Sequence, residues 1–169
     1  MAKLKRVDYI FVHTAADPRE GGRRDTTAAE ITAWHRARGW STIGYHYVVR
    51  RDGTIEKGRD ETEVGAHVRG MNHRSIGICL SGHHDYVPMT PSQQNALIRL
   101  LVQLCQRYQL PIHRILGHRE VNQLVAAGVL DPIYQTSKSC PGRYVMMSMV
   151  RKAVAEQLEK EGTQKNDGN

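Results

Sequence analysis

Apolar residues follow the period of β-strands in four stretches of the chain. These stretches are residues 7–13, 45–58, 73–82 and 113–121. In the first of them Tyr9 and Phe11 alternate with Ile10 and Val12, so both faces are apolar. This pattern is typical of a strand in the middle of a sheet.

The second stretch, residues 45–58, predicts a β-hairpin. Two runs of strand-forming residues flank Asp52-Gly53, a pair that tolerates the positive φ angles of a tight primed turn. Because side chains alternate along a strand, Tyr45, Tyr47 and Val49 are predicted to share one face of the hairpin.

Three other stretches have helical spacing of their apolar residues. They are residues 27–39, 90–110 and 144–160. In the first, Thr27 is followed three residues later by Glu30, which is the pattern of a capping box. In the second, Thr90 is the expected N-cap and Gln93 is expected to close another capping box. Strands and helices therefore alternate along the chain.

This alternation predicts an α/β fold, a single domain with a central mixed β-sheet flanked by helices. We expect the domain to comprise residues 1–160, with a disordered tail at residues 161–169 and a long irregular loop at residues 122–139. A chain of 169 residues with 40% hydrophobic content is large enough for one core.

Composition and charge narrow the possible functions. The sequence contains no run of about 18 apolar residues, so we expect no membrane insertion. The first residues do not have the pattern of a secretory signal, so we expect synthesis in the cytoplasm. The net charge of +7 favours acidic partners, namely nucleic acid, anionic lipid or an acidic envelope polymer. Because no nucleic-acid-binding motif accompanies the charge, we do not expect nucleic acid to be the partner.

Histidine and cysteine placement gives the first indication of chemistry. His13 and His118 each stand at the end of a predicted strand, and Cys140 lies in the loop before the last helix. If the two strands are neighbours, these side chains meet at one edge of the sheet. Two imidazoles and a thiolate suit one zinc ion, and three protein ligands leave a coordination position open, as in catalytic zinc sites. We expect Cys79 and Cys105 to be buried packing residues.

Two alternatives remain open at this point. Cys140 could be a nucleophile whose pKa is lowered by Lys138, with His118 as base and Glu120 as the orienting carboxylate. A rival metal cluster could form at residues 83–85 (HHD), although no third ligand is evident nearby. His35 and His46 are most simply structural or exposed.

Five blocks of the sequence resemble one known family. They are HTAA, WHRARGWSTIGYHYVVRRDGTIEKGRD, VGAHVRGMNHRSIGICLSG, GHREV and KSCPG, in this order within residues 7–150. Together they are similar to the zinc-dependent N-acetylmuramoyl-L-alanine amidases of amidase type 2, a group that includes the peptidoglycan recognition proteins. Within this group the chain most resembles short phage endolysins.

The resemblance implies a role for particular residues. His13, His118 and Cys140 correspond to the ligands of one zinc ion, and Tyr45 and Lys138 to the catalytic side chains. The implied reaction is hydrolysis, by a zinc-activated water, of the amide between N-acetylmuramic acid and L-alanine. A non-catalytic peptidoglycan-binding module of the same fold is the alternative, but such members usually lack the cysteine.

The resemblance also implies a substrate groove. His67, Asn72 and Ser75 are expected to line it, although Asn72 could instead fix its loop by bonds to the backbone. Trp34 and Trp40 are expected in the core. The segment between His118 and Lys138 is longer than in the shortest phage members, and residues 124–130 (LVAAGVL) could form an extra helical turn over the groove.

The expected partner is bacterial peptidoglycan, and we expect the chain to be a monomer. A polymerase or another protein could be a further partner, which the sequence does not identify. Synthesis is expected in an infected host cell, with action on the cell wall after another factor gives the enzyme access to it.

Overall fold

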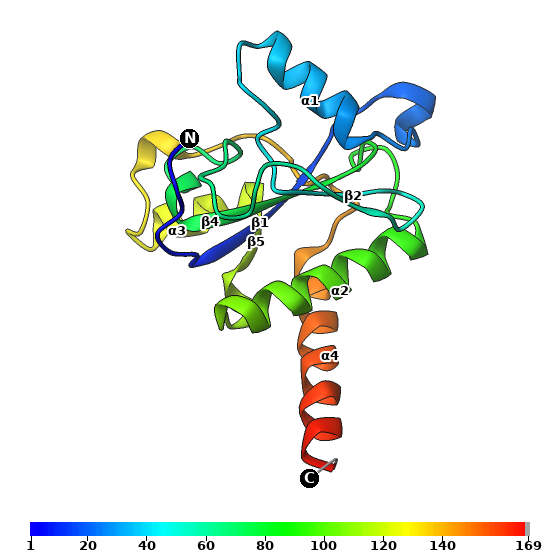
Figure 1. Ribbon diagram of the computed structural model, residues 1–169, viewed down its shortest axis with the longest axis vertical. Coiled ribbons are helices and arrows are strands. Elements are labelled where there is room, and N and C mark those ends of the chain that lie inside the picture. The colour runs from blue at the N-terminus through cyan, green and yellow to red at the C-terminus, as the bar shows by residue number, and fades with distance from the viewer. Residues whose placement is uncertain (168–169) are drawn as a thin grey trace.

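A mixed β-sheet of five strands organises the residues that the computed structural model describes, 1–167, with side chains through residue 162 (Figure 1). The strands are β1 (Tyr9–Thr14), β2 (Tyr47–Val49), β3 (Ile55–Lys57), β4 (Ser75–Leu80) and β5 (Ile115–Gly117). Their order is β3-β2-β4-β1-β5, and only the β2–β3 hairpin is antiparallel. The predicted α/β fold with a central mixed sheet is confirmed.

Helices α1 (Ala28–Ala37) and α2 (Pro91–Tyr108) connect strands, and α3 (Val121–Ala126) and α4 (Met147–Asp167) follow β5. Single 3-10 turns are η1 (Arg19–Gly22), η2 (Asn72–Arg74), η3 (Ile112–Arg114), η4 (His118–Glu120) and η5 (Pro132–Tyr134). The capping box of Thr27 and Glu30 forms as predicted. Within the described residues, no helix has the length and apolar character needed to cross a bilayer.

One face of the sheet packs against α2, and α4 begins beside α2 and then runs away from the sheet (Figure 1). Leu101 of α2 and Val154 of α4 pack into the same cluster as Ile78 and Leu80 of β4, and all four are fully buried. Burying an aliphatic side chain of this size stabilises the fold by about 1.5–3 kcal/mol. This face is therefore the main apolar core.

The opposite face carries two smaller apolar clusters. In one, Ile31 of α1 packs with Val48 of β2, and in the other, Leu124 of α3 packs with Phe11 of β1. Figure 1 shows α1 and α2 on opposite sides of the sheet. His13 lies on the same face as Phe11, and its ring is next to the rings of Tyr45 and His67, so polar side chains gather between the two apolar clusters.

The hairpin and the second helix differ from prediction in detail. Gly53 alone of the Asp52-Gly53 pair has a positive φ, 92°, and its N–H donates to the Arg50 carbonyl, so the turn is not a primed one. Thr90 accepts from the Gln93 N–H, but the Gln93 carboxamide donates to two backbone carbonyls instead of closing a capping box. Gln93 is fully buried, and these contacts pair its amide nitrogen, whereas its carboxamide oxygen has no hydrogen-bond partner among the described residues.

Three further predictions need correction. Tyr45 does not share a face with Tyr47, because the strand begins only at Tyr47 and Tyr45 packs beside the α1 cluster. Part of the expected loop at 122–139 is ordered as α3 and η5. Helix α4 is described as far as Asp167, within the segment where a tail was expected from residue 161. Residues 168–169 lie outside the described part of the chain.

Candidate metal centre and active site

The parallel pairing of β1 with β5 brings His13 and His118 together. The register pairs Val12 with Gly117, and the residues that follow them are His13 and His118. Their ring centroids lie 4.9 Å apart. Gly117 leaves room for the loop that follows Cys140, because a Cβ there would lie 2.8 Å from a ring carbon of Pro141. The condition on which the sequence-based triplet depended is met.

The loop that carries Cys140 is held by hydrogen bonds to the side chains of Arg119 and Asp85. The Arg119 guanidinium donates to the carbonyls of Ser139, Gly142 and Val145. On the other side, the Asp85 carboxylate accepts from the Ser139 hydroxyl at 2.6 Å. These contacts hold the backbone on both sides of Cys140.

The thiol of Cys140 points at the two histidines. Cys140 Sγ lies 3.7 Å from His13 Nδ1 and 3.4 Å from the Thr14 backbone N–H. The ligand atoms of His13, His118 and Cys140 all lie within 4.8 Å of one another. A tetrahedral zinc ion with bonds of about 2.0–2.3 Å requires ligand atoms at such separations. The donor set therefore fits zinc in both distance and type.

Protonation favours the two imidazoles as ligands. Burial and the nearby Lys138 ammonium lower the pKa of His118 to about 4, and burial holds the pKa of His13 well below its ordinary value. Both rings are therefore neutral at pH 7, and each has a lone pair available for a metal.

The cysteine behaves differently from the sequence-based argument. Burial raises the pKa of Cys140 to about 11, which outweighs the opposing effects of the Thr14 N–H and Lys138. Lys138 does lower the pKa of Cys140, as expected, but burial of the thiol has the larger effect and the net pKa is raised. Metal binding must displace the thiol proton.

The cysteine-nucleophile alternative lacks its orienting carboxylate. Glu120 accepts from Arg151 Nη1 at 2.8 Å and from the Gly117 N–H at 2.8 Å. It therefore faces helix α4 and does not orient His118.

Tyr45 and Lys138 line the same cavity as the three ligand residues. The cavity has a volume of about 340 Å³. The Tyr45 ring lies 5.1 Å from that of His13, and burial together with the Cys79 and Cys140 thiols raises the pKa of Tyr45 well above its ordinary value. Tyr45 thus remains a hydrogen-bond donor throughout the neutral range. The Lys138 side chain is exposed at the mouth of the cavity.

A groove of about 470 Å³ continues from this cavity and shares His118, Lys138 and His67 with it. Asn72 also lines the groove, but its carboxamide oxygen accepts from the backbone N–H groups of His67 and Val68, at 2.8 and 2.9 Å. This contact corresponds to the loop-fixing alternative for Asn72. His67 Nδ1 lies 3.0 Å from His13 Nε2.

Sequence reasoning missed several groove residues. Trp40 was expected in the core, but it is 37% exposed and lines both the cavity and the groove beside Arg38. Ile133, 77% exposed, lies on the groove wall. Trp34 is also 37% exposed and lies under the Arg19 guanidinium. Trp40 follows Gly39, beyond the end of α1, so it is not part of the apolar face of that helix. This position could have identified Trp40 as a residue outside the core.

The remaining histidines of the sequence-based alternatives have structural contacts. His84 is fully buried, and its two ring nitrogens contact the carbonyls of Val87 and Ser81, so it is not available as a metal ligand. His46 Nδ1 accepts from the Gly77 N–H, and His35 Nδ1 accepts from a backbone N–H as well.

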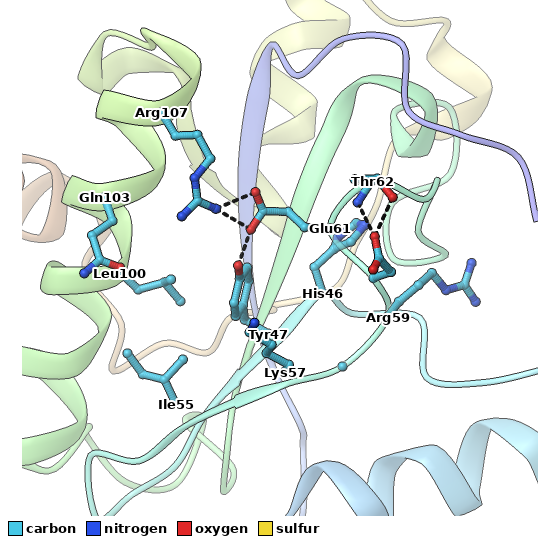
Figure 2. Close-up of a pocket in the computed structure, with 12 residues that line it drawn as sticks. His46, Tyr47, Ile55, Lys57, Arg59, Glu61, Thr62, Leu100, Gln103 and Arg107 are labelled. Atoms are coloured by element: carbon cyan, nitrogen blue, oxygen red, sulfur yellow. Dashed lines mark hydrogen bonds and ion pairs between the residues drawn. The ribbon is translucent and has the colours of Figure 1, made fainter.

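A second, larger cavity, of about 690 Å³, lies between the hairpin, residues 58–62 and α2. Figure 2 shows the Glu61 carboxylate there, facing Arg107 and the Tyr47 hydroxyl. Burial raises the pKa of Glu61, but hydrogen bonds from Arg107, Tyr108 and Tyr47 outweigh it and keep the pKa below its ordinary value. Glu61 is therefore an ion-paired structural carboxylate. The metal-ligating group found among the described residues lies at the other cavity.

A family model described as N-acetylmuramoyl-L-alanine amidase matches residues 3–143. The endolysin of Escherichia phage T7 is 42% identical over 119 residues, which cover 68% of this chain and 76% of the endolysin. Peptidoglycan-recognition protein SC2 of Drosophila melanogaster is 33% identical over 130 residues, covering 72% of this chain and 68% of that protein.

Among solved structures, the N-acetylmuramoyl-L-alanine amidase LysC from Clostridium intestinale URNW superimposes with a TM-score of 0.73. The two are 29% identical, and the match covers 89% of this chain and 86% of LysC. The residues matched by the family model include His13, His118 and Cys140.

Proposed function

The chain belongs to the N-acetylmuramoyl-L-alanine amidase family, and we propose that its reaction centre is the cavity formed by His13, His118 and Cys140, with one zinc ion as cofactor. It is a peptidoglycan amidase, which cleaves the amide between the lactyl group of N-acetylmuramic acid and L-alanine. One observation carries the zinc assignment: two neutral imidazoles and a thiol converge at a solvent-connected cavity.

A zinc ion held there would supply Lewis-acid chemistry, polarising the amide carbonyl and making water acidic enough to attack at neutral pH. Tyr45 would donate a hydrogen bond to the carbonyl oxygen as negative charge develops on it. Lys138, at the cavity mouth, would place a positive charge beside the same oxygen. A donor in such a position stabilises the transition state by about 3 kcal/mol. Either group can also return a proton to the leaving amine.

The groove beside the cavity would hold the rest of the substrate. Arg38 and Arg69 line it together with the exposed Ile133 and Trp40. Stem peptides carry carboxylates, which guanidinium groups bind well, and sugar rings stack on apolar and aromatic surfaces. In this proposal His67 and Asn72 form the groove floor nearest the reaction centre.

The biological role that fits is lysis of a bacterial host by a phage endolysin. The phage T7 relative carries the name endolysin and matches 68% of this chain. In this role the protein is made in the cytoplasm of an infected cell and acts on peptidoglycan once it reaches the wall. The non-catalytic alternative has less support, since Tyr45, Lys138 and Cys140 are all present and share one cavity.

The test is digestion of purified peptidoglycan by the metal-loaded protein, with Cys140→Ala as the inactive control. We expect new amino groups on L-alanine, and we expect a chelator to abolish their release. New reducing sugar ends would instead indicate a glycosidase and contradict the proposal. Peptidoglycan binding without any cleavage would support the recognition-module alternative.

A further inference from the structure

We propose that His67 is a positioning residue for the metal centre, which fixes the tautomer of His13 so that Nδ1 faces Cys140 with a free lone pair. This proposal rests on the proposed function only for the identity of the metal. It assigns to His67 a task in the protein before the metal binds, and it differs from the substrate-contact role expected from the sequence.

A chain of hydrogen bonds determines the direction of donation. The Ser75 hydroxyl lies 2.7 Å from the Met71 carbonyl, 3.4 Å from His67 Nε2, and is fully buried. A carbonyl can only accept, so the Ser75 hydroxyl donates its proton to Met71. Ser75 Oγ must then accept from His67 Nε2–H.

The same logic continues to His13. If His67 carries its proton on Nε2, its Nδ1 is an acceptor. His67 Nδ1 lies 3.0 Å from His13 Nε2, so His13 Nε2–H is the donor in this contact. His13 Nδ1 is then unprotonated, and this is the nitrogen that lies 3.7 Å from Cys140 Sγ. The Met71 carbonyl thus sets the direction of donation along the series Ser75, His67 and His13, and leaves His13 Nδ1 free to face Cys140.

The backbone holds the His67 ring in this orientation. The Asn72 carboxamide oxygen accepts from the N–H groups of His67 and Val68. Two glycines face the ring: a Cβ at Gly77 would lie 2.6 Å from the ring of His67, and one at Gly65 would lie 2.8 Å from it. The ring therefore lies flat against backbone, where any side chain would displace it.

Comparison with two buried histidines argues against a role in packing alone for His67. The ring nitrogens of His84 and His46 contact backbone groups, which anchor each ring locally. The nitrogens of His67 instead contact two side chains, and one of these belongs to a metal-ligand residue. Hydrogen bonds to the second nitrogen of a ligating histidine commonly change metal affinity by about 10–100-fold.

Zinc affinity tests the acceptor role. In competition with a chromophoric chelator, we expect His67→Leu to weaken zinc binding by about 10–100-fold, since it keeps bulk but removes the acceptor. His67→Asn places a carboxamide oxygen where Nδ1 was, and we expect it to restore much of the affinity. Equal affinity of the wild type and a folded His67→Leu variant would overturn the proposal.

Two buried serines provide a matched pair of variants. Ser75 is the first residue of β4 and Ser81 directly follows its last residue. Both are fully buried and both donate to a backbone carbonyl, but only Ser75 contacts His67. We expect Ser75→Ala to weaken zinc binding, by less than His67→Leu does. We expect Ser81→Ala to change thermal stability but not zinc affinity. Equal zinc affinities for the two variants would contradict the relay.

The tautomers can also be read directly in the metal-free wild type, which avoids any folding defect of a variant. We expect ¹⁵N chemical shifts to show that His13 and His67 are both protonated on Nε2. A proton on His13 Nδ1 would overturn the proposal. If the tautomers are as expected but no amide is cleaved, the proposed function fails while the positioning role stands.

Discussion

Removing the Tyr45 hydroxyl tests the assignment of the reaction centre. The change Tyr45→Phe keeps the ring that packs 5.1 Å from His13 and deletes only the donor. The structure keeps this hydroxyl protonated, because burial and two neighbouring thiols raise its pKa well above the ordinary value. In the wild type, the Tyr45 hydroxyl should therefore remain protonated, and able to donate a hydrogen bond, from pH 7 up to the ordinary tyrosine pKa of 10.0.

The expected magnitude follows from the loss of one donor to the developing oxyanion. Such a loss costs about 2.7–4 kcal/mol, so kcat should fall by about 100-fold to 1,000-fold while KM changes little. Zinc content should stay the same, because Tyr45 is outside the ligand group. The melting temperature should move by only a few degrees, since about 1 kcal/mol corresponds to about 2–4 °C in a domain of this size.

The assay measures release of L-alanine amino groups from purified peptidoglycan under steady-state conditions. Tyr47→Phe is the matched control, because its hydroxyl donates to Glu61 in the other cavity (Figure 2). We expect Tyr47→Phe to lose stability and to retain kcat. A kcat for Tyr45→Phe within threefold of wild type would refute the reasoning.

Three further outcomes follow from the charges of the site and the core. Lys138→Ala should keep one zinc per chain and lower kcat by about 100-fold, measured as above. Zinc uptake at pH 6, where water bound to zinc with a pKa of about 7 stays largely unionised, should release one proton, because the pKa of Cys140 is raised to about 11 and that of His118 lowered to about 4. The affinity for zinc should then rise about tenfold per pH unit. Calorimetry in buffers of different ionisation enthalpy measures the number of protons released, and a value of two or more would contradict this prediction. Glu120→Gln should lower stability by about 2 kcal/mol at neutral pH by weakening the pair with Arg151. Burial raises the pKa of Glu120, but Arg151 and the Gly117 N–H lower it below the ordinary 4.5, so its contribution is present above that pH and is lost as pH falls through the lower native value. Chemical denaturation at several pH values checks this, and a difference between variant and wild type that persisted below the native pKa would count against it.

Local sequence patterns predicted the elements well because they reflect local physics. The Thr27 capping box and the two-faced strand at β1 depend on neighbours in the chain, and both formed. The sequence predicted that His13 and His118 lie close together only if their strands are neighbours in the sheet. The order of parallel strands depends on contacts between distant segments, which local patterns do not reveal. The β1–β5 pairing supplied that condition.

The failures concern properties that depend on burial. Lys138 does favour the Cys140 thiolate, but desolvation of the sulfur is larger, and the sequence does not show how deeply a loop residue is buried. Trp40 was expected in the core, whereas it lies at the groove. Tyr45 does not share a face with Tyr47, because β2 begins only at Tyr47 and the backbone before it is irregular. The alternation of side chains along a strand therefore does not apply to Tyr45.

X-ray absorption at the zinc edge tests the central claim most directly. The account predicts one zinc per chain, with one sulfur neighbour at about 2.3 Å and two imidazole nitrogens at about 2.0–2.1 Å. Cys140→Ala should remove the sulfur contribution. A zinc environment of nitrogen and oxygen alone in the wild-type protein, or an active enzyme that contains no metal, would contradict the account.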